Sequence, residues 1–342
     1  MTAIDLYDGI TLHQGDCRDI MRSLPADHFD AVITDPPYGI SFQGEKWDTA
    51  TPTGFQSWAQ SWGEEALRIL KPGGYLLAFS APRTYHRLTS GLEDAGFEIR
   101  DAMAWIRADG KPTGTDLSAA FDRDAGVLDQ REGRVIERWD TSAVATDISS
   151  YKTSATGKPI TDEAKAWEGW GVGLKPAWEP IVVARRPLEG RLVDNVREHG
   201  TGALNIRAGM DAVNGLYPPN LLMGEQAMAA AVEQGAPDHV WPVFRYQPKA
   251  PTSERPKVGG VQHVTVKPLD LMRYLIRLVV RPGSLILEPF AGSGTTLQAA
   301  AMENTRAVGC ELDDRYIPLI KARFAQGIEA PLDLFTLGDD AA

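Results

Sequence analysis

Two blocks of short apolar runs alternating with amphipathic stretches enclose a long polar middle, and this arrangement constrains the fold more than any other feature. Strands buried on both faces give unbroken apolar runs, whereas a surface helix repeats its apolar residues every three to four positions. In the first block, residues 10–106, the expected elements are in order a strand, a helix, a strand, a helix and a strand, at residues 31–34, 55–70, 75–79, 85–95 and 99–106. Such alternation predicts an α/β fold with a doubly wound, mostly parallel sheet.

The second block repeats the alternation near the end of the chain. Its expected elements are a helix, a strand, a helix, a strand and a helix, at residues 271–279, 285–287, 295–302, 307–310 and 313–324. Strand–helix units on both sides of an irregular middle predict one sheet to which both blocks contribute.

The polar middle divides the chain into six expected parts. Two irregular stretches of this length are too long to be simple connections in a compact domain, so they are expected to form a separate recognition module, to be partly disordered, or both. The parts are a first half at 1–106, an irregular insert at 107–178 with a helix from Asp116 to Asp124, a strand returning to the core at 179–185, a second irregular region at 186–262, a second half at 263–326 and an acidic, flexible tail at 327–342.

The formal net charge of −11 argues against a nucleic-acid partner at first sight, because phosphate contacts need Lys and Arg. The charge is uneven, however, since eight basic residues face two acidic ones between positions 245 and 281, a local charge of +6. The basic residues are Arg245, Lys249, Arg255, Lys257, Lys267, Arg273, Arg277 and Arg281. A local basic patch leaves nucleic-acid binding open.

Cysteine usage and hydropathy bear on where the chain works. Cys17 and Cys310 are the only two cysteines and stand in unlike contexts, which disfavours a disulfide framework and favours a reducing cytoplasm. They and the six histidines lack metal-ligand spacing, so no metal site is expected. No apolar run reaches the ~18–20 residues that span a membrane, and the N-terminal segment lacks the pattern of a secretory signal.

A glycine-rich turn in the second half predicts a cofactor site. This glycine turn, Phe-Ala-Gly-Ser-Gly-Thr-Thr at residues 290–296, follows an expected strand and opens an expected helix. Gly292 and Gly294 permit close approach of the backbone to a ligand, and the helix N-terminus favours an anion. Glu311 lies nineteen residues after Gly292, where a carboxylate can accept both ribose hydroxyls. A structural turn with a surface glutamate is the alternative.

The glycine turn departs from a dinucleotide fingerprint in one respect. It lacks the third glycine and carries Thr295 and Thr296 instead, so it suits a pyrophosphate less well. S-adenosylmethionine is therefore favoured over NAD, with its methionine carboxylate near the backbone amides.

A second motif, here called the DPPY turn, predicts a catalytic centre in the first half. Asp35, Pro36, Pro37 and Tyr38 follow an expected strand, at the edge where open α/β sheets bind ligands. The Asp35 carboxylate and the Pro36 carbonyl can accept hydrogen bonds from an exocyclic amine and aim its lone pair at a methyl donor. The prolines stiffen the turn, and Tyr38 offers a face to a flipped base. An ordinary Asp-Pro turn is the alternative.

The two motifs, in this order, resemble the β class of amino-methyltransferases that modify DNA. Gly15-Asp16-Cys17 resembles the segment of that class that holds the adenine of the cofactor, and residues 263–268 resemble the segment that carries Thr265 and Lys267 near its methionine. The resemblance covers residues 10–106 and 175–325, and shorter stretches after Thr115 and Gly200 look like phage-type members.

The resemblance implies a circularly permuted methyltransferase fold, with a catalytic half at 1–106, target recognition at 186–262 and a cofactor-binding half at 263–326. Phe42 and Trp47, which follow the DPPY turn, are expected to line a base pocket together with Tyr38. The resemblance assigns Asp35, Pro36, Pro37 and Tyr38 to catalysis. It assigns cofactor binding to Asp16, Cys17, Asp35, Thr265, Lys267, Phe290, Gly292, Gly294, Thr295 and Glu311.

Several of these side chains have an alternative structural reading. The structural readings are core packing for Phe42 and Trp47, a turn cap for Asp16, a small buried residue contributing only backbone for Cys17, and a surface charge for Lys267. Arg273 and Arg277 lie four residues apart on an expected helix, and a plain exposed face is the favoured reading for them.

The expected reaction is methyl transfer from S-adenosylmethionine to N6 of a flipped adenine in double-stranded DNA. N4 of cytosine is the close alternative, because Asp at the first motif position favours adenine while Ser is commoner for cytosine. Ring-carbon methylation is disfavoured, since neither cysteine has the Pro-Cys setting of that chemistry. Methylation of RNA bases or of protein glutamine, and DNA binding without catalysis, are less favoured functions that the sequence leaves open.

The expected setting is the cytoplasm of a bacterial or phage-infected cell, within a restriction-modification context. The resemblance leaves open a homodimer and a partner restriction endonuclease.

Overall fold

The computed structural model describes residues 3–40, 48, 51–106, 115–133, 157–174, 176–209, 217–224, 233 and 250–328. The chain divides into two compact units, one of Met1–Ile106 with Trp178–Ala342 and one of Arg107–Ala177.

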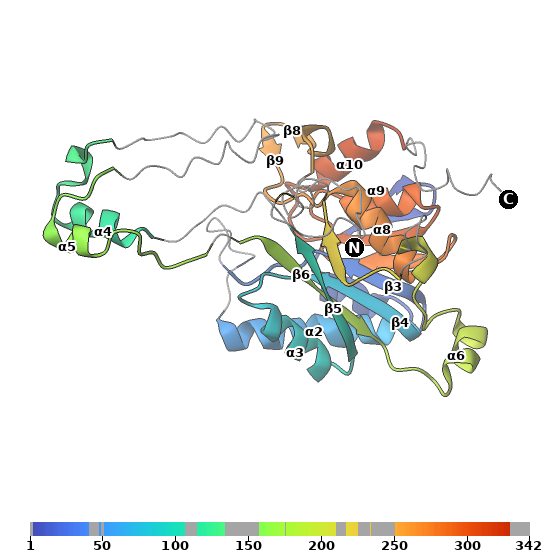
Figure 1. The fold of residues 1–342 in the computed structure, drawn as a ribbon. Coiled ribbons are helices and arrows are strands. Elements are labelled where there is room, and N and C mark those ends of the chain that lie inside the picture. Colours follow the sequence, from blue (N-terminus) through green and yellow to red (C-terminus); the bar gives the residue numbers. More distant parts are fainter. Residues whose placement is uncertain are drawn as a thin grey trace. The chain divides into compact units, whose positions relative to one another are not determined.

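The first unit contains the sheet (Figure 1). Its strands are β1 (Ala3–Tyr7), β2 (Ile10–Gln14), β3 (Phe29–Thr34), β4 (Leu70–Phe79), β5 (Glu98–Ile106), β6 (Trp178–Arg185), β7 (Leu221–Met223), β10 (Leu285–Glu288) and β11 (Arg306–Glu311), with a separate hairpin of β8 (Lys257–Val258) and β9 (Val261–Gln262). Its helices are α1 (Cys17–Ser23), α2 (Pro52–Ile69), α3 (Tyr85–Asp94), α6 (Leu192–His199), α8 (Leu269–Val279), α9 (Thr295–Met302) and α10 (Ile317–Ala325), with short 3-10 turns η5 (Ile206–Gly209) and η6 (Thr252–Glu254).

Within the described residues, the strand order of the sheet is β1-β2-β11-β10-β3-β4-β6-β5-β7. The central pairs from β2 to β4 are all parallel, whereas β6 runs antiparallel to β4 and β5. The predicted doubly wound, mostly parallel sheet is therefore confirmed. Its two halves meet where β10 pairs with β3, Ile286 opposite Ala31 and Leu287 opposite Val32.

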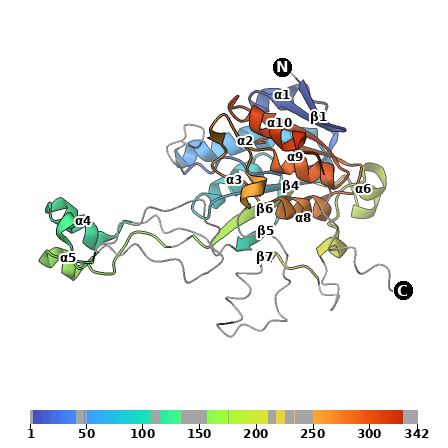
Figure 2. The ribbon, with the colours of Figure 1, turned by 90° about the horizontal axis from the view of Figure 1, so that it is seen from above.

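Helices cover both faces of this sheet (Figures 1 and 2). Side chains of α1, α2 and α3 pack on one face with Val32 and Leu287, and side chains of α8, α9 and α10 pack on the other with Ala31 and Ile33. Successive residues of β3 thus enter opposite cores, which explains why its whole sequence is buried and apolar except for Asp30 and Thr34.

The predicted helix boundaries hold closely, with one exception. Helix α2 begins at Pro52, where the Thr51 side chain accepts a hydrogen bond from the Gly54 N–H, and buries the predicted stripe through Trp62 and Ala66. Helix α10 begins at Ile317 rather than 313, because the Asp313 N–H donates to Glu311 Oε1 instead of entering a helical turn. None of the helices in the described ranges is long and apolar enough to cross a membrane.

The insert between β5 and β6 leaves and rejoins the sheet at one point. Ile106, the last residue of β5, is the register partner of Trp178, the first residue of β6. The two strands form a continuous antiparallel pair on the sheet side of this junction.

The second unit contains α4 (Leu117–Asp124), η3 (Leu128–Gln130) and α5 (Asp162–Ala166). The predicted helix from Asp116 is confirmed, with Asp116 as its N-cap. Its buried centre contains a charged group, since the buried Asp122 accepts hydrogen bonds from Thr161 Oγ1, from Arg131 Nε at 2.6 Å and from the Ile160 and Thr161 N–H groups. Burial alone would raise the pKa of Asp122, but these hydrogen bonds lower it overall.

Candidate active site

The DPPY turn and the glycine turn leave neighbouring strands at the same edge of the sheet. Residues 35–38 continue from β3 and residues 290–296 follow β10, and parallel pairing brings the carboxyl ends of these strands together. The Thr34 hydroxyl, at the end of β3, donates directly to the carboxylate of Glu288, at the end of β10. The two motifs predicted from opposite halves of the chain therefore lie side by side.

Asp35 belongs to a compact polar cluster. Lys267 Nζ lies 2.5 Å from Asp35 Oδ2 and 3.5 Å from Glu179 Oε2, and it donates to Tyr38 Oη at 3.0 Å. The Tyr38 hydroxyl lies 2.8 Å from Asp35 Oδ1 and 3.0 Å from Glu179 Oε2, so it donates its one proton to either carboxylate. One lysine and one phenol thus hold two carboxylates in a fixed arrangement.

The electrostatics of this cluster keep Tyr38 in its phenol form. Burial and then the neighbouring charges of Asp35 and Glu179 raise its pKa well above the usual value. The side chain of Lys267 is 8% exposed and its cation also lies 4.7 Å from the centre of the Phe79 ring. The alternative reading of Lys267 as a surface charge is therefore wrong.

Glu179 was not singled out from the sequence. It sits second in β6, whose later residues from Pro180 to Arg185 are all buried. A charged residue at the start of a run of buried apolar residues was the available signal, but no motif linked it to Asp35.

Asp48 is a second residue that the sequence did not reveal. Its buried carboxylate accepts hydrogen bonds from the Gly39 N–H at 2.7 Å and the Ile40 N–H at 3.2 Å, immediately after the DPPY turn. Asp48 therefore fixes the path by which the chain leaves that turn. Phe42 and Trp47, predicted for the base pocket, lie outside the described residues.

The glycine turn has the backbone geometry that its sequence predicts. Gly292 and Gly294 have φ of +52° and +80°, which favours glycine. A Cβ on Gly294 would lie 3.0 Å from Ile320 Cγ2, and one on Gly292 would lie 3.0 Å from His263 Nε2. The ring of His263 thus packs against the turn, and its Nδ1 bonds the Thr265 carbonyl.

Glu311 stands beside this turn at the end of β11, as predicted. Its Oε2 accepts from the Gly292 N–H at 2.7 Å and its Oε1 from the Asp313 N–H at 2.8 Å. Burial raises the pKa of Glu311 to about 7. Each carboxylate oxygen keeps a further lone pair, so the pair of oxygens fits a vicinal diol such as that of a ribose.

Glu288 lies beneath both turns and is almost fully buried. It accepts hydrogen bonds from Thr34, from the Phe290 N–H at 3.0 Å and from Thr296 Oγ1 at 2.6 Å. Burial raises its pKa to about 8. Its position makes it a link between the two turns rather than a ligand-facing group.

Asp16 and Cys17 follow β2. The preceding residue, Gly15, donates its N–H to the Glu311 carbonyl at 2.9 Å, which brings this segment next to Glu311. Asp16 caps α1 through the Arg18 N–H and pairs with the Arg18 guanidinium at 2.6 Å, whose hydrogen bond lowers the Asp16 pKa. Cys17 is buried, and burial raises its thiol pKa to about 12. Such a thiol is not a nucleophile at neutral pH.

The two remaining predicted residues of the glycine turn point into the protein. The Phe290 ring packs against Trp58 and Trp62 with centroid distances of 5.5 and 5.6 Å. Thr295 is buried, and its hydroxyl lies 3.2 Å from Ser293 Oγ.

The prediction that Arg273 and Arg277 lie on an exposed face of α8 is wrong. Arg273 is buried, and Arg273 Nε and Arg277 Nε bond the two oxygens of Glu303 at 2.6 and 2.5 Å. Both guanidiniums therefore join α8 to the end of α9. Lys267, Arg273 and Arg277, which belong to the basic residues between positions 245 and 281, thus bond carboxylates within the fold.

The sequence and the fold resemble those of known proteins. The DNA methylase family N6_N4_Mtase matches residues 29–322. The type II methyltransferase M.HindIII of Haemophilus influenzae is 28% identical over 331 residues, covering 85% of this chain and 87% of that protein. The type II methyltransferase M.BamHI of Bacillus amyloliquefaciens is 30% identical over 74 residues, 21% of this chain and 18% of that protein.

Among solved structures, PvuII DNA methyltransferase, described as cytosine-N4-specific, matches with a TM-score of 0.50 and 16% identity, covering 92% of this chain and 85% of that chain. Likeness at this identity shows a shared fold.

Proposed function

The chain belongs to the N6_N4_Mtase family of DNA methylases, and on this premise we propose that it methylates N6 of a flipped adenine at a specific site in double-stranded DNA. The observation that carries the proposal is the parallel pairing of β3 with β10, since it joins the DPPY turn to the glycine turn. Amino-methylation needs hydrogen-bond acceptors for the amine and a turn that binds the cofactor, both at the same edge of the sheet.

S-adenosylmethionine is the cofactor, and when bound it supplies a methyl group on a positively charged sulfur. The glycine turn would hold its methionine part, together with Thr265. Glu311 would accept its ribose hydroxyls, and the segment of Asp16 and Cys17 would border its adenine. The buried Glu311 carboxylate and the positive φ of Gly292 and Gly294 suit these roles.

Asp35 and the Pro36 carbonyl would each accept a hydrogen bond from one N–H group of the target amine. Two acceptors draw the nitrogen towards tetrahedral geometry and aim its lone pair away from the ring. Each oxygen of Asp35 already accepts one hydrogen bond, from Tyr38 or Lys267, and each has a further lone pair for the amine. Lys267 would hold the Asp35 side chain in place through its contact with Oδ2.

Tyr38 would serve in two ways. Its ring offers a stacking face to the flipped base, and its hydroxyl holds Asp35 in place. Because its pKa is raised, the hydroxyl remains a donor throughout the neutral range.

The choice of adenine rests on Asp35 at the first position of the motif. Incubation of the protein with methyl-labelled S-adenosylmethionine and, in separate reactions, mixed-sequence DNA, RNA or protein, followed by mass spectrometry of the nucleosides and amino acids, tests this choice. We expect N6-methyladenine. Label in N4-methylcytosine would overturn the choice of base and keep the amino-methyltransferase, whereas label only in RNA or protein would overturn the DNA substrate.

Target recognition is assigned to residues 186–262, with a contribution from the insert at 107–178. We place the enzyme in the cytoplasm, where its DNA lies, and in a restriction-modification setting. Sequencing of methylated DNA would give the recognition site, and light scattering of the DNA complex would test a homodimer.

A further inference from the structure

A buried guanidinium lies against the back of the glycine turn. Arg323, on α10, is 4% exposed, and its Nε donates to the Ser293 carbonyl at 2.8 Å while its Nη2 lies 3.3 Å from Ser293 Oγ. Nothing in the sequence marked this residue, because it stands in the last helix, away from the motifs.

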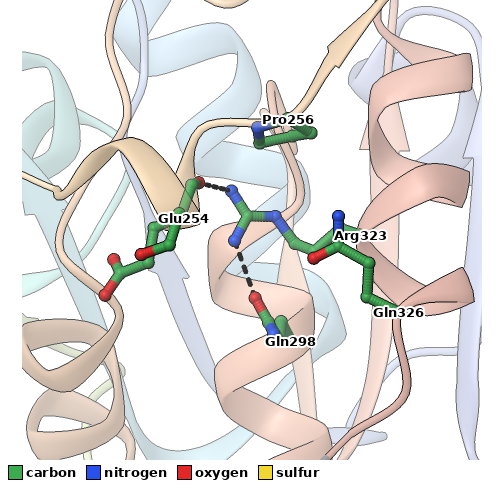
Figure 3. A pocket seen from close by; sticks show the side chains of 6 residues that line it. Glu254, Pro256, Gln298, Arg323 and Gln326 are labelled. Carbon is green, nitrogen blue, oxygen red and sulfur yellow. Dashed lines mark hydrogen bonds between the residues drawn. The ribbon is translucent and has the colours of Figure 1, made fainter.

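The same guanidinium bonds two further segments (Figure 3). Its Nη1 donates to Gln298 Oε1 on α9 at 2.7 Å, and its Nη2 donates to the Glu254 carbonyl in η6 at 2.7 Å. Burial lowers the pKa of Arg323 to about 10, so the side chain is still a cation at neutral pH. The planar fork therefore ties α9, η6 and the glycine turn to α10.

The hydrogen bond from Arg323 to the Ser293 carbonyl fixes the backbone of the glycine turn at Ser293. It lies between two glycines of positive φ, which have more backbone freedom than other residues. The Ser293 carbonyl and the Gly294 N–H belong to one planar peptide, so holding the oxygen also sets the direction of that N–H. The Gly294 N–H donates to the Ala291 carbonyl at 2.7 Å, and the peptide is thus held from both sides.

Glu254 extends the connection towards Lys267. While its carbonyl accepts from Arg323, its side-chain Oε2 accepts from the Leu269 N–H at 2.9 Å. Leu269 is the first residue of α8 and follows Lys267 by two positions, so Glu254 caps the helix whose start carries the lysine of the Asp35 cluster.

We propose that Arg323 is a positioning residue for S-adenosylmethionine, which holds the Ser293–Gly294 peptide in its cofactor-binding orientation and couples it to the segment before α8. The proposal rests on the proposed function, since it concerns the cofactor of that site. Arg323 acts through the backbone of the turn.

A small cavity next to Arg323 bears on the choice of variant. It has a volume of ≈ 40 Å³ and is lined by Ser253, Glu254, Pro256, Gln298, Arg323 and Gln326. This is room for a water molecule. The Arg323→Lys variant keeps the positive charge, and water can occupy the space left by the guanidinium. A single ammonium group then replaces the planar guanidinium and its several hydrogen-bond donors.

The test is direct binding of S-adenosylmethionine by calorimetry, together with methylation kinetics. For Arg323→Lys we expect the Kd for the cofactor to rise about tenfold, while kcat at saturating cofactor stays within about twofold. For Gln298→Ala, which removes one anchor of the guanidinium, we expect a rise of about threefold. If Arg323→Lys does not fold, the Kd of the milder Gln298→Ala variant tests the proposal.

Arg185→Lys is the matched control. Arg185 is also buried, and its guanidinium bonds Glu98 and the Gly202 carbonyl, but it pairs opposite Tyr75, far along β4 from the DPPY turn. We expect this variant to lose thermal stability and keep the wild-type Kd.

Three outcomes would overturn the role of Arg323. They are a wild-type Kd in both folded Arg323→Lys and Gln298→Ala, equal weakening in the Arg185 control, or a fall in kcat with Kd unchanged. Absence of cofactor binding by the wild-type protein would instead overturn the proposed function together with this inference.

Discussion

Lys267 Nζ lies 2.5 Å from Asp35 Oδ2, so a cation from the second half of the chain is paired with the carboxylate of the DPPY turn in the first half. The pair is largely shielded from water, with side-chain exposures of 8% for Lys267 and 19% for Asp35. Glu179 and Tyr38 complete the cluster, which makes the arrangement of Asp35 depend on elements far away in sequence.

Replacing Lys267 by Met should destabilise the protein and slow methylation. Loss of the cation leaves Asp35 and Glu179 close together without the positive charge that lies between them, and breaking a buried pair costs about 3 kcal/mol. Urea unfolding and single-turnover methylation would measure the two effects.

Lys71→Met is the control for Lys267, because Lys71 Nζ, on β4, pairs at 2.7 Å with Asp30, which lies at the opposite end of β3 from Asp35. The Lys71 side chain is 30% exposed against 8% for Lys267, so we expect a loss of about 1 kcal/mol or less and an unchanged methylation rate. Equal rates for Lys267→Met and wild type would contradict the role given to Lys267.

Asp35→Asn and Asp35→Ala should keep cofactor binding and lose methylation. An amide or a methyl group no longer supplies the charged acceptor for the amine, and removal of one such group costs about 10²–10³ in rate. Calorimetry with S-adenosylmethionine and a labelled-methyl assay would separate binding from chemistry. A variant that still labels DNA at the wild-type rate would show that Asp35 does not orient the amine.

Cofactor affinity should increase as the pH rises through about 7. Burial raises the pKa of Glu311 to about 7, so the carboxyl is mostly protonated below this pH and ionised above it. The ionised form accepts hydrogen bonds more strongly than the neutral acid, by about 1 kcal/mol. We expect the Kd for S-adenosylmethionine to be about fivefold lower at pH 8 than at pH 6.

Glu311→Gln serves as the control for this pH dependence. Its amide oxygen still accepts a hydrogen bond but does not titrate, so the Kd of the variant should be higher than that of the wild type at pH 8 and nearly constant with pH. A similar pH dependence in wild type and variant would assign the effect to another group.

Asp48→Ala should slow methylation without weakening cofactor binding. The Gly39 and Ile40 N–H groups lose their acceptor, which loosens the exit of the DPPY turn. We expect a fall in kcat of about tenfold and a loss of stability of about 1–3 kcal/mol. Steady-state kinetics with both substrates varied would test this, and a change confined to the KM for S-adenosylmethionine would refute it.

Much of the fold followed from local patterns. The buried runs at 31–34 and 285–287 predicted the strands β3 and β10, and the turns that follow them predicted which edge carries the site. Glu311 could also be placed, because the end of the next strand after a glycine turn has a fixed position in this type of sheet.

The long-range polar contacts could not be predicted in this way. Glu179, Asp48 and Arg323 become meaningful only through their partners in three dimensions, and no spacing along the chain encodes those partners. Arg273 and Arg277 illustrate the opposite error, since their helical spacing suggested an exposed face although Glu303 accepts hydrogen bonds from both.

The junction of Ile106 with Trp178 has a consequence for how such a gene can change. Because these two residues are register partners in adjacent strands, the polypeptide between them begins and ends at neighbouring points. The entropic cost of closing a loop between two such points changes only slowly with the length of the loop. Recombination that exchanges, shortens or extends this insert leaves the hydrogen bonds between β5 and β6 intact. A lineage can therefore acquire a new insert and inherit the sheet unchanged.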